Sequence, residues 1–123
     1  MIKVIASDMD GTLLGDDHKI APETLSAVKE ACDAGIRFMI CTGRNFPGAM
    51  NELEGADLTC DYIVGSGAEV RDPQRRVVKT TSISMELCGE IYEAVRKYPI
   101  SVTFCTDGDD YRIGTEEEVE ESI

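Results

Sequence analysis

Three short apolar segments that alternate with two helical segments constrain the fold of this chain more than any other feature. The apolar segments cover residues 2–7, 36–41 and 62–64, and each stops abruptly at a polar residue or a glycine. The intervening segments, 22–34 and 46–53, carry apolar residues at helical spacing. Short apolar runs joined by helices are typical of buried parallel strands. We therefore predict an α/β fold with a parallel sheet and right-handed crossovers.

The pattern changes after the third apolar segment. Turn residues between short apolar runs predict two hairpins, over residues 68–81 and 100–113. A helix is predicted between them over residues 85–97, with Ser84 as its N-cap, and another helix is predicted to begin at Thr115. This second part is α+β in character. We place a domain boundary where the pattern changes, which divides the chain into residues 1–65 and 66–123.

The predicted helix between the hairpins has an apolar stripe, which we expect to be buried. The stripe consists of Met85, Leu87, Ile91 and Val95.

The charge balance excludes several classes of protein. The 123 residues include 12 Lys and Arg against 24 Asp and Glu, which gives a net charge of −12. So acidic a chain lacks the basic stripe that nucleic-acid binding needs. No apolar run is long enough to span a membrane, and no secretory leader is visible. Five scattered cysteines without a C-x-x-C pair indicate buried, reduced thiols in a cytoplasmic protein.

Two carboxylates directly follow the first predicted strand, in the string Asp8-Met9-Asp10-Gly11-Thr12-Leu13-Leu14. Ligands of open parallel sheets bind beyond the carboxyl ends of the strands, so Asp8 and Asp10 lie where a site is expected. Oxygen ligands this close suit a divalent cation. They also suit divided labour, with one carboxylate as nucleophile and the other exchanging a proton. An ordinary acidic turn is the alternative, which bare Asp-Gly alone would favour.

A second polar string, Thr42-Gly43-Arg44, ends the next predicted strand. Thr42 offers a hydroxyl, Gly43 exposes its backbone N–H, and the following helix contributes a positive dipole end. These are the parts of a phosphate cradle. Arg44 either assists phosphate binding or braces the loop.

The D-x-D-G-T-L-L and T-G-R strings resemble the first two motifs of the haloacid dehalogenase superfamily of phosphotransferases. The hairpin after Gly65-Ser66-Gly67 is similar to the start of the α+β cap of the Cof-type, subfamily IIB sugar-phosphatase branch. The resemblance implies a Rossmannoid parallel-sheet core, of which residues 1–65 are the N-terminal half. It implies that residues 66–123 are the first part of the cap domain.

The resemblance also implies roles for individual residues. Asp8 would attack phosphorus and form an aspartyl-phosphate, and Asp10 would protonate the leaving oxygen and then activate water. Mg²⁺ would be held by the Asp8 carboxylate and the Asp10 backbone carbonyl. The phosphoryl oxygens would be held by Thr42 and by the backbone amides of Met9 and Gly43. A cation is needed because the nucleophile and the phosphate are both anionic.

The chain departs from the family pattern in one respect. Members need a lysine and a Gly-Asp metal string, which normally follow the cap, and neither Lys79 nor Lys97 matches that lysine. Gly108-Asp109-Asp110 lies in a predicted hairpin and is not interpreted as the metal string. We therefore expect a truncated chain with little or no turnover. The first strand would then keep an uncovered apolar edge, which should pair with another copy, swap elements with it or take a partner chain.

These inferences lead to a Mg²⁺-dependent phosphatase that acts on small phosphorylated metabolites such as sugar phosphates. Two alternatives stay open at this point. A sugar phosphomutase of the same superfamily would transfer the phosphoryl group within a sugar. A catalytically silent fragment or interaction module would keep the two motifs without the chemistry.

Overall fold

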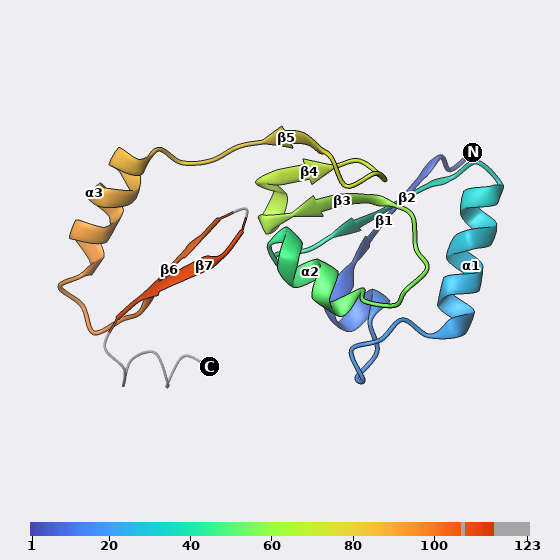
Figure 1. The fold of residues 1–123 in the computed structure, drawn as a ribbon, viewed down its shortest axis with the longest axis horizontal. Helices are drawn as coiled ribbons and strands as arrows, with labels where there is room; N and C mark the ends of the chain where they lie inside the picture. Colours follow the sequence, from blue (N-terminus) through green and yellow to red (C-terminus); the bar gives the residue numbers. More distant parts are fainter. Residues whose placement is uncertain (107, 115–123) are drawn as a thin grey trace. The chain divides into compact units, whose positions relative to one another are not determined.

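The computed structural model describes residues 1–106 and 108–114, which form seven strands, three helices and two short turns of helix. Figure 1 shows the elements in chain order. The first part consists of β1 (Val4–Asp8), α1 (Pro22–Asp33), β2 (Arg37–Cys41), α2 (Phe46–Glu52), β3 (Asp61–Val64), β4 (Glu69–Arg71) and β5 (Val77–Thr80). The second part consists of α3 (Met85–Val95), β6 (Val102–Cys105) and β7 (Asp110–Ile113). The helix predicted to begin at Thr115 lies outside the described residues.

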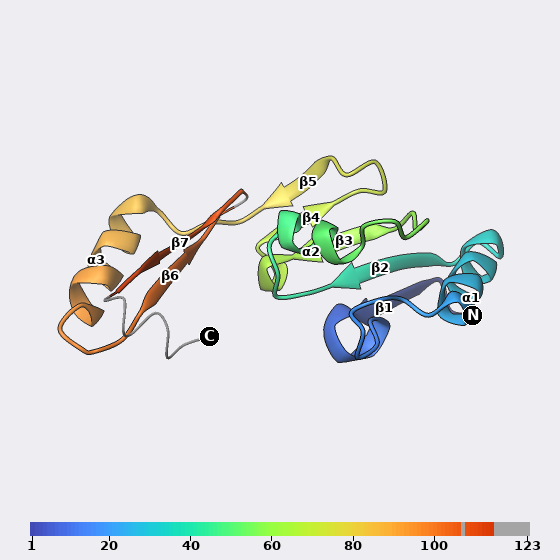
Figure 2. The same ribbon diagram turned by 60° about the horizontal axis from the view of Figure 1, so that its bottom comes forward.

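The first five strands make one sheet in the order β1-β2-β3-β4-β5. The first three strands are parallel, and β4 and β5 continue the sheet antiparallel. In both ribbon views β2 lies between β1 and β3 (Figures 1 and 2). The predicted α/β fold with a parallel sheet is confirmed.

One face of the sheet is buried against α1 and α2. The strands present Phe38, Ile40, Tyr62 and Val64 to this core, and Val28 of α1 lies in the same cluster. The helices begin where the sequence supplies start signals. A proline stands in the first turn of each, and the Asn45 side chain caps α2 by accepting a hydrogen bond from the Gly48 amide at 2.8 Å. Burial of this face fixes the strand register and therefore which strand residues face the other side.

The first strand differs from its predicted burial. We predicted a buried strand, but Val4 is 47% exposed and Ile5 is 37% exposed. The reason is topological: among the described residues β1 pairs with β2 on one side only. Its other side presents unpaired backbone N–H and C=O groups, as the predicted uncovered edge requires.

The division into compact units also differs from the prediction. The chain divides after Thr81, whereas we predicted a boundary after residue 65. The physical reason is backbone pairing. The hairpin of β4 and β5 adds to the sheet through β3, with Val70 opposite Ile63, so it is held by the first unit.

The second unit contains α3 and the antiparallel pair β6 and β7. Ser84 caps α3 as predicted, with its hydroxyl accepting from the Leu87 amide at 3.1 Å. The predicted buried stripe is wrong: Met85 is 86% exposed, Leu87 and Ile91 are also exposed, and Val95 is only half-buried.

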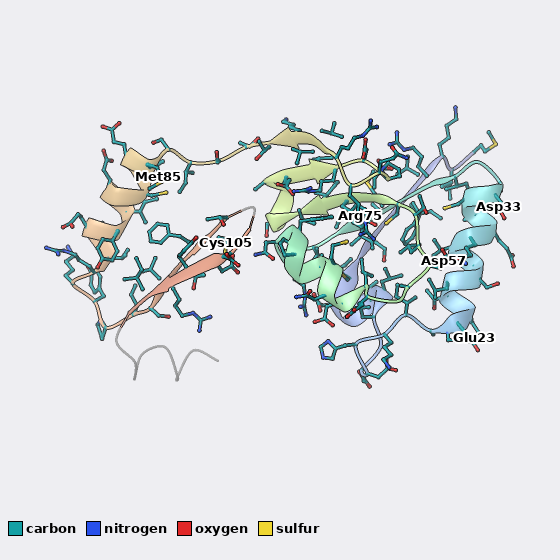
Figure 3. The ribbon with its side chains drawn as sticks, viewed as in Figure 1. Glu23, Asp33, Asp57, Arg75, Met85 and Cys105 are labelled. Carbon is teal, nitrogen blue, oxygen red and sulfur yellow. The ribbon has the colours of Figure 1, made fainter. Side chains whose placement is uncertain are left out.

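The cysteines are all free, as predicted, but they are not uniformly buried: Cys60 is in the core, whereas Cys105 on β6 is exposed. Figure 3 labels Met85 on α3 and Cys105 on β6. No helix among the described residues is long and apolar enough to cross a membrane.

Candidate active site

The floor of the candidate site is set by strand register. Asp8 stands opposite Cys41, and Cys41 stands opposite Ile63, so these last strand residues share one face of the sheet. This face is opposite the core that Phe38 and Ile40 enter, because side chains alternate along a strand. Asp8 is exposed at the carboxyl end of its strand. Register therefore places its carboxylate on the open face, away from the apolar interior.

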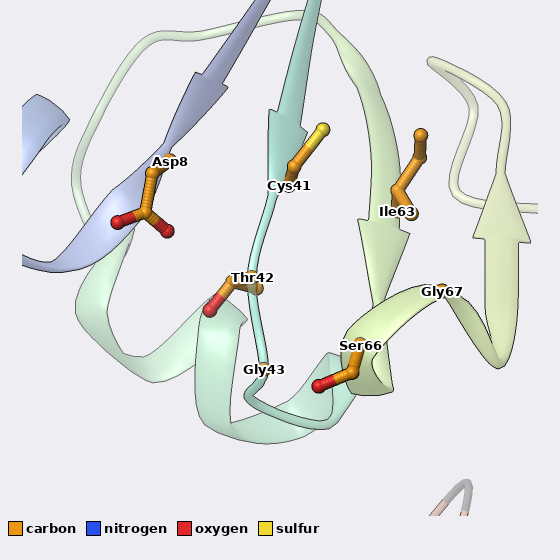
Figure 4. A pocket seen from close by; sticks show the side chains of 7 residues that line it. All are labelled: Asp8, Cys41, Thr42, Gly43, Ile63, Ser66 and Gly67. Atoms are coloured by element: carbon orange, nitrogen blue, oxygen red, sulfur yellow. The ribbon is translucent and has the colours of Figure 1, made fainter.

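The loops that follow β2 and β3 complete a pocket of about 350 Å³. Figure 4 shows its lining, with the Asp8 carboxylate and the Thr42 hydroxyl directed into the same space. Thr42 is 6% exposed and its amide donates to the Ile63 carbonyl at 2.9 Å, so its position is fixed by the sheet. The pocket is lined by Asp8, Cys41, Thr42, Gly43, Ile63, Ser66 and Gly67. It brings together three of the predicted site residues: Asp8, Thr42 and Gly43.

The two nucleophilic groups on the pocket floor differ in their ionisation. Burial raises the pKa of the Cys41 thiol, and the nearby Asp8 carboxylate raises it further. A thiol with a raised pKa stays neutral near neutral pH and is a poor nucleophile. The Asp8 carboxylate is therefore the better candidate nucleophile in this pocket.

Asp10 lies just beyond the pocket lining and is held by Arg44. The guanidinium Nε and Nη2 donate to the two carboxylate oxygens at 2.9 and 2.8 Å. This hydrogen bonding lowers the pKa of Asp10 below its ordinary value and raises the pKa of Arg44. Asp10 is thus ionised in this arrangement, and it can donate a proton only after Arg44 loosens its hold.

Beyond Asp10, Arg44 also contacts Glu52, which in turn lies close to His18. The remaining Arg44 nitrogen, Nη1, donates to a Glu52 oxygen at 2.8 Å. The His18 Nδ1 atom lies 3.6 Å from the other Glu52 oxygen. Arg44 therefore braces the loop, the second of the two roles we considered for it. Its phosphate-binding role has no support in this arrangement, because all three nitrogens are engaged and the side chain does not line the pocket.

The turn between the two carboxylates depends on Met9 and Gly11. The Met9 side chain is fully buried in the core, and its carbonyl accepts from the Leu14 amide at 2.9 Å. Gly11 has a φ of +70°, a left-handed conformation that favours glycine. The buried Met9 anchors the turn, so the flanking carboxylates of Asp8 and Asp10 stay on the exposed side.

The oxygen ligands for a cation are compatible with Mg²⁺. Among residues 1–106 and 108–114 no three His, Cys, Asp or Glu side chains gather into a metal cluster. Mg²⁺ does not require one, because it keeps several waters and is commonly bound by one or two carboxylates and a substrate phosphate. The exposed Asp8 carboxylate meets that need, and the Asp10 side chain does not, because Arg44 occupies both of its oxygens. The donor set of this chain therefore fits Mg²⁺ through Asp8, with the Asp10 backbone carbonyl as the predicted second ligand.

Sequence reasoning missed two residues near the site. Ser66 lines the pocket, and the Glu52 carboxylate holds Arg44. Glu52 carries no motif signal, since it ends a helix like many surface carboxylates. Ser66 could have been noticed as the second residue after a third strand end, between two glycines.

Comparison with known proteins gives a consistent result. The profile of the haloacid dehalogenase-like hydrolases matches residues 5–123. Over 89 residues the chain is 37% identical to the 5-amino-6-(5-phospho-D-ribitylamino)uracil phosphatase of Bacillus subtilis (strain 168), covering 68% of this chain and 36% of that protein. The chain thus spans little more than a third of the length of that relative.

Solved structures resemble the whole fold. A haloacid dehalogenase-like hydrolase from B. subtilis has a TM-score of 0.86 at 26% identity, over 98% of this chain and 42% of that one. A sugar phosphatase of haloacid dehalogenase subclass IIB has a TM-score of 0.76 at 26% identity, over 97% of this chain and 46% of that one. The fold of this chain therefore resembles that of known haloacid dehalogenase-like hydrolases.

Proposed function

Because the chain belongs to the family of haloacid dehalogenase-like hydrolases, we propose that it carries the phosphoryl-transfer residues of a Mg²⁺-dependent phosphatase. The substrates we propose are small phosphorylated metabolites such as sugar phosphates. The observation that carries the proposal is the pocket in which the Asp8 carboxylate and the Thr42 hydroxyl face the same space (Figure 4). The names of a phosphatase relative and of a subclass IIB sugar phosphatase support the same class of reaction.

In the proposed reaction Asp8 is the nucleophile. One of its carboxylate oxygens attacks phosphorus while the bond from phosphorus to the leaving oxygen breaks, which leaves an aspartyl-phosphate on Asp8. The leaving oxygen takes a proton from Asp10. The Thr42 hydroxyl and the Met9 and Gly43 amides donate hydrogen bonds to the phosphoryl oxygens as their charge changes. Bound Mg²⁺ would offset the repulsion between the two anions.

Asp10 gives up a proton in the first step and accepts one in the second step. Its contact with Arg44 affects the protonation state that each step requires. After the leaving group departs, Asp10 is a carboxylate and accepts a proton from water, which attacks phosphorus and releases inorganic phosphate from Asp8. Arg44 favours this ionised form through the two hydrogen bonds to Asp10. Protonation before the first step requires Arg44 to release at least one of those oxygens.

We also propose that this chain alone turns over slowly at most. No lysine is among the residues that line the described pocket, and the curated relative is longer than the matched segment. A lysine would neutralise the charge shared by nucleophile and phosphoryl group. In this proposal the chain acts in the cytoplasm, and the segment after Thr81 begins the cap.

The test is phosphate release from p-nitrophenyl phosphate and from glucose 6-phosphate in the presence and absence of Mg²⁺. The unchanged chain is compared with Asp8→Asn, which keeps the shape of the side chain and removes its charge. A slow, Mg²⁺-dependent release that the variant lacks supports the proposal. Equal rates in the two proteins refute Asp8 as nucleophile. Conversion of the sugar phosphate to an isomer without phosphate release identifies a phosphomutase instead, and no reaction in either protein favours a silent module.

A further inference from the structure

Ser66 has a backbone conformation that is unfavourable for serine. Its φ is +55° and its ψ is 32°, in the left-handed region. The glycines on both sides, Gly65 and Gly67, also have positive φ. A glycine at position 66 would adopt this conformation without cost, whereas it destabilises a serine. Residues strained in this way concentrate at functional sites. The strain directs attention to the serine hydroxyl.

Two backbone hydrogen bonds tie this turn to the loop after β2. The Gly65 amide donates to the Arg44 carbonyl at 2.7 Å, and the Ser66 amide donates to the Thr42 carbonyl at 3.1 Å. The position of Ser66 is therefore fixed relative to Thr42. A backbone that is already fixed in this way loses little entropy when the residue binds a ligand.

The Ser66 side chain lies on the wall of the same pocket as Asp8. In Figure 4 its hydroxyl points toward Gly43, and Asp8 lies on the other side of Thr42. A Cβ atom on Gly43 would lie 3.4 Å from the Ser66 hydroxyl oxygen, which shows how near that oxygen stands to the loop backbone. The hydroxyl can donate one hydrogen bond and accept two.

Strand spacing separates Ser66 from the transferred phosphoryl group. Asp8 belongs to β1, whereas Ser66 follows β3, two strands away in the sheet. Neighbouring strands are about 4.8 Å apart, so these strand ends are roughly 10 Å apart. A phosphoryl group against Asp8 reaches Thr42 on the adjacent strand. The spacing therefore leaves Ser66 to face substrate atoms other than the group bonded to Asp8.

We propose that the Ser66 hydroxyl hydrogen-bonds a polar atom of the leaving group, such as a sugar hydroxyl, and thereby selects polar phosphate esters. This proposal rests on the proposed phosphatase function, because it presumes a phosphoryl group beside Asp8 and Thr42. It assigns Ser66 a role in substrate choice and none in the attack on phosphorus.

Binding measurements test the proposal without depending on turnover. Inorganic phosphate and glucose 6-phosphate are titrated with Mg²⁺ into the chain that keeps Asp8, which turns over slowly at most, by nuclear magnetic resonance. Ser66→Ala keeps the Cβ atom and removes the hydroxyl. It should weaken glucose 6-phosphate about three- to tenfold, as expected for one hydrogen bond, and leave inorganic phosphate unchanged. Ser66→Asn, which tolerates the left-handed conformation and keeps a polar group, should restore part of the affinity.

Ser66→Gly relieves the backbone strain, so it keeps the test valid if Ser66→Ala does not fold. It should weaken glucose 6-phosphate as Ser66→Ala does. Unchanged affinity for the sugar phosphate in these variants overturns the proposal. Equal weakening of both ligands also overturns it, because Ser66 would then hold the phosphoryl group. If neither ligand shifts the Thr42 and Gly43 amides before Ser66 is changed, the phosphatase function itself fails, and the inference fails with it.

Discussion

Arg44 grips both carboxylate oxygens of Asp10, with its Nε and Nη2 atoms at 2.9 and 2.8 Å. The contact joins the turn after β1 to the loop after β2, across 34 residues of sequence. Fork-to-fork pairing of this kind fixes orientation as well as distance. The proposed general acid and base is therefore oriented by a residue that does not itself line the pocket.

Arg44→Lys should lower kcat and leave phosphate affinity unchanged. A lysine keeps the positive charge but cannot hold two oxygens in a planar fork, so Asp10 would lose its fixed orientation. We expect a loss of about tenfold or more in kcat, within the range for general acid–base groups. The measurement is a comparison of kcat with the dissociation constant for inorganic phosphate.

Glu52→Gln is the matched control for that variant. Glu52 accepts from the third nitrogen of Arg44 at 2.8 Å, so its loss should loosen Arg44 without removing the contact to Asp10. We expect a smaller fall in kcat than for Arg44→Lys. A large loss of phosphate affinity in Arg44→Lys would instead show that Arg44 binds the substrate directly.

The free energy of unfolding should fall steeply as pH rises, because the thiol of Cys60 is buried. Cys60 is 2% exposed, and burial raises its pKa from 9.0 to about 11. A raised pKa means that the unfolded chain loses this proton first as pH increases. The buried neutral thiol therefore lowers the free energy of unfolding by nothing below pH 9. Between pH 9 and about 11 the free energy of unfolding falls by roughly 3 kcal/mol in total.

Urea unfolding of the chain and of Cys60→Ala between pH 8 and 11 measures this effect (about 1.4 kcal/mol per pH unit). The difference in slope reports the thiol together with its contact to Tyr62, because Cys60 also raises the pKa of Tyr62. The variant should retain a shallower slope, since burial also raises the pKa of Tyr62, to about 12. Identical slopes in the two proteins would contradict the assignment.

We expect the chain to associate through the open edge of β1. Its Val4 and Ile5 side chains are exposed, and its outer backbone groups have no strand partner among the described residues. Val4→Lys places a charge at this edge and should reduce association, because edge lysines oppose strand pairing. Light scattering over a range of concentrations measures the mass.

Val78→Lys is the control for association, since Val78 is 65% exposed on β5, the opposite edge of the same sheet. It should leave the mass unchanged. A monodisperse monomer of the unchanged chain, or equal effects of the two lysines, would count against pairing through β1.

The order of strands and helices could be predicted from the sequence because each carried a local signal. Pro22 and Ser84 marked helix starts, and the apolar run before Asp8 marked a strand. The domain boundary could not be predicted, because the pairing of β4 with β3 is a long-range contact that turn residues do not report. The burial of β1 and of the apolar face of α3 was predicted wrongly for a similar reason. An apolar strand or helix face predicts burial, but whether another element covers that face depends on the rest of the chain.

The candidate site was predictable in part. Asp8 and Thr42 end adjacent parallel strands, so their meeting follows from the topology. The partner of Arg44 did not follow, because a guanidinium near a strand end can reach either a phosphate or a carboxylate. Ser66 was missed because its signal is a backbone dihedral angle, which residue type alone does not reveal.

The central claim is that Asp8 becomes covalently bonded to phosphorus, and trapping that bond tests it most directly. A single turnover suffices, so even a slow chain can be tested. The chain is mixed with p-nitrophenyl phosphate and Mg²⁺, quenched in acid and examined by peptide mass spectrometry. We predict a phosphoryl group on Asp8 that accumulates in Asp10→Asn, since hydrolysis needs the Asp10 base, and is absent from Asp8→Asn. Phosphorylation of another residue, or none in Asp10→Asn, would contradict the claim.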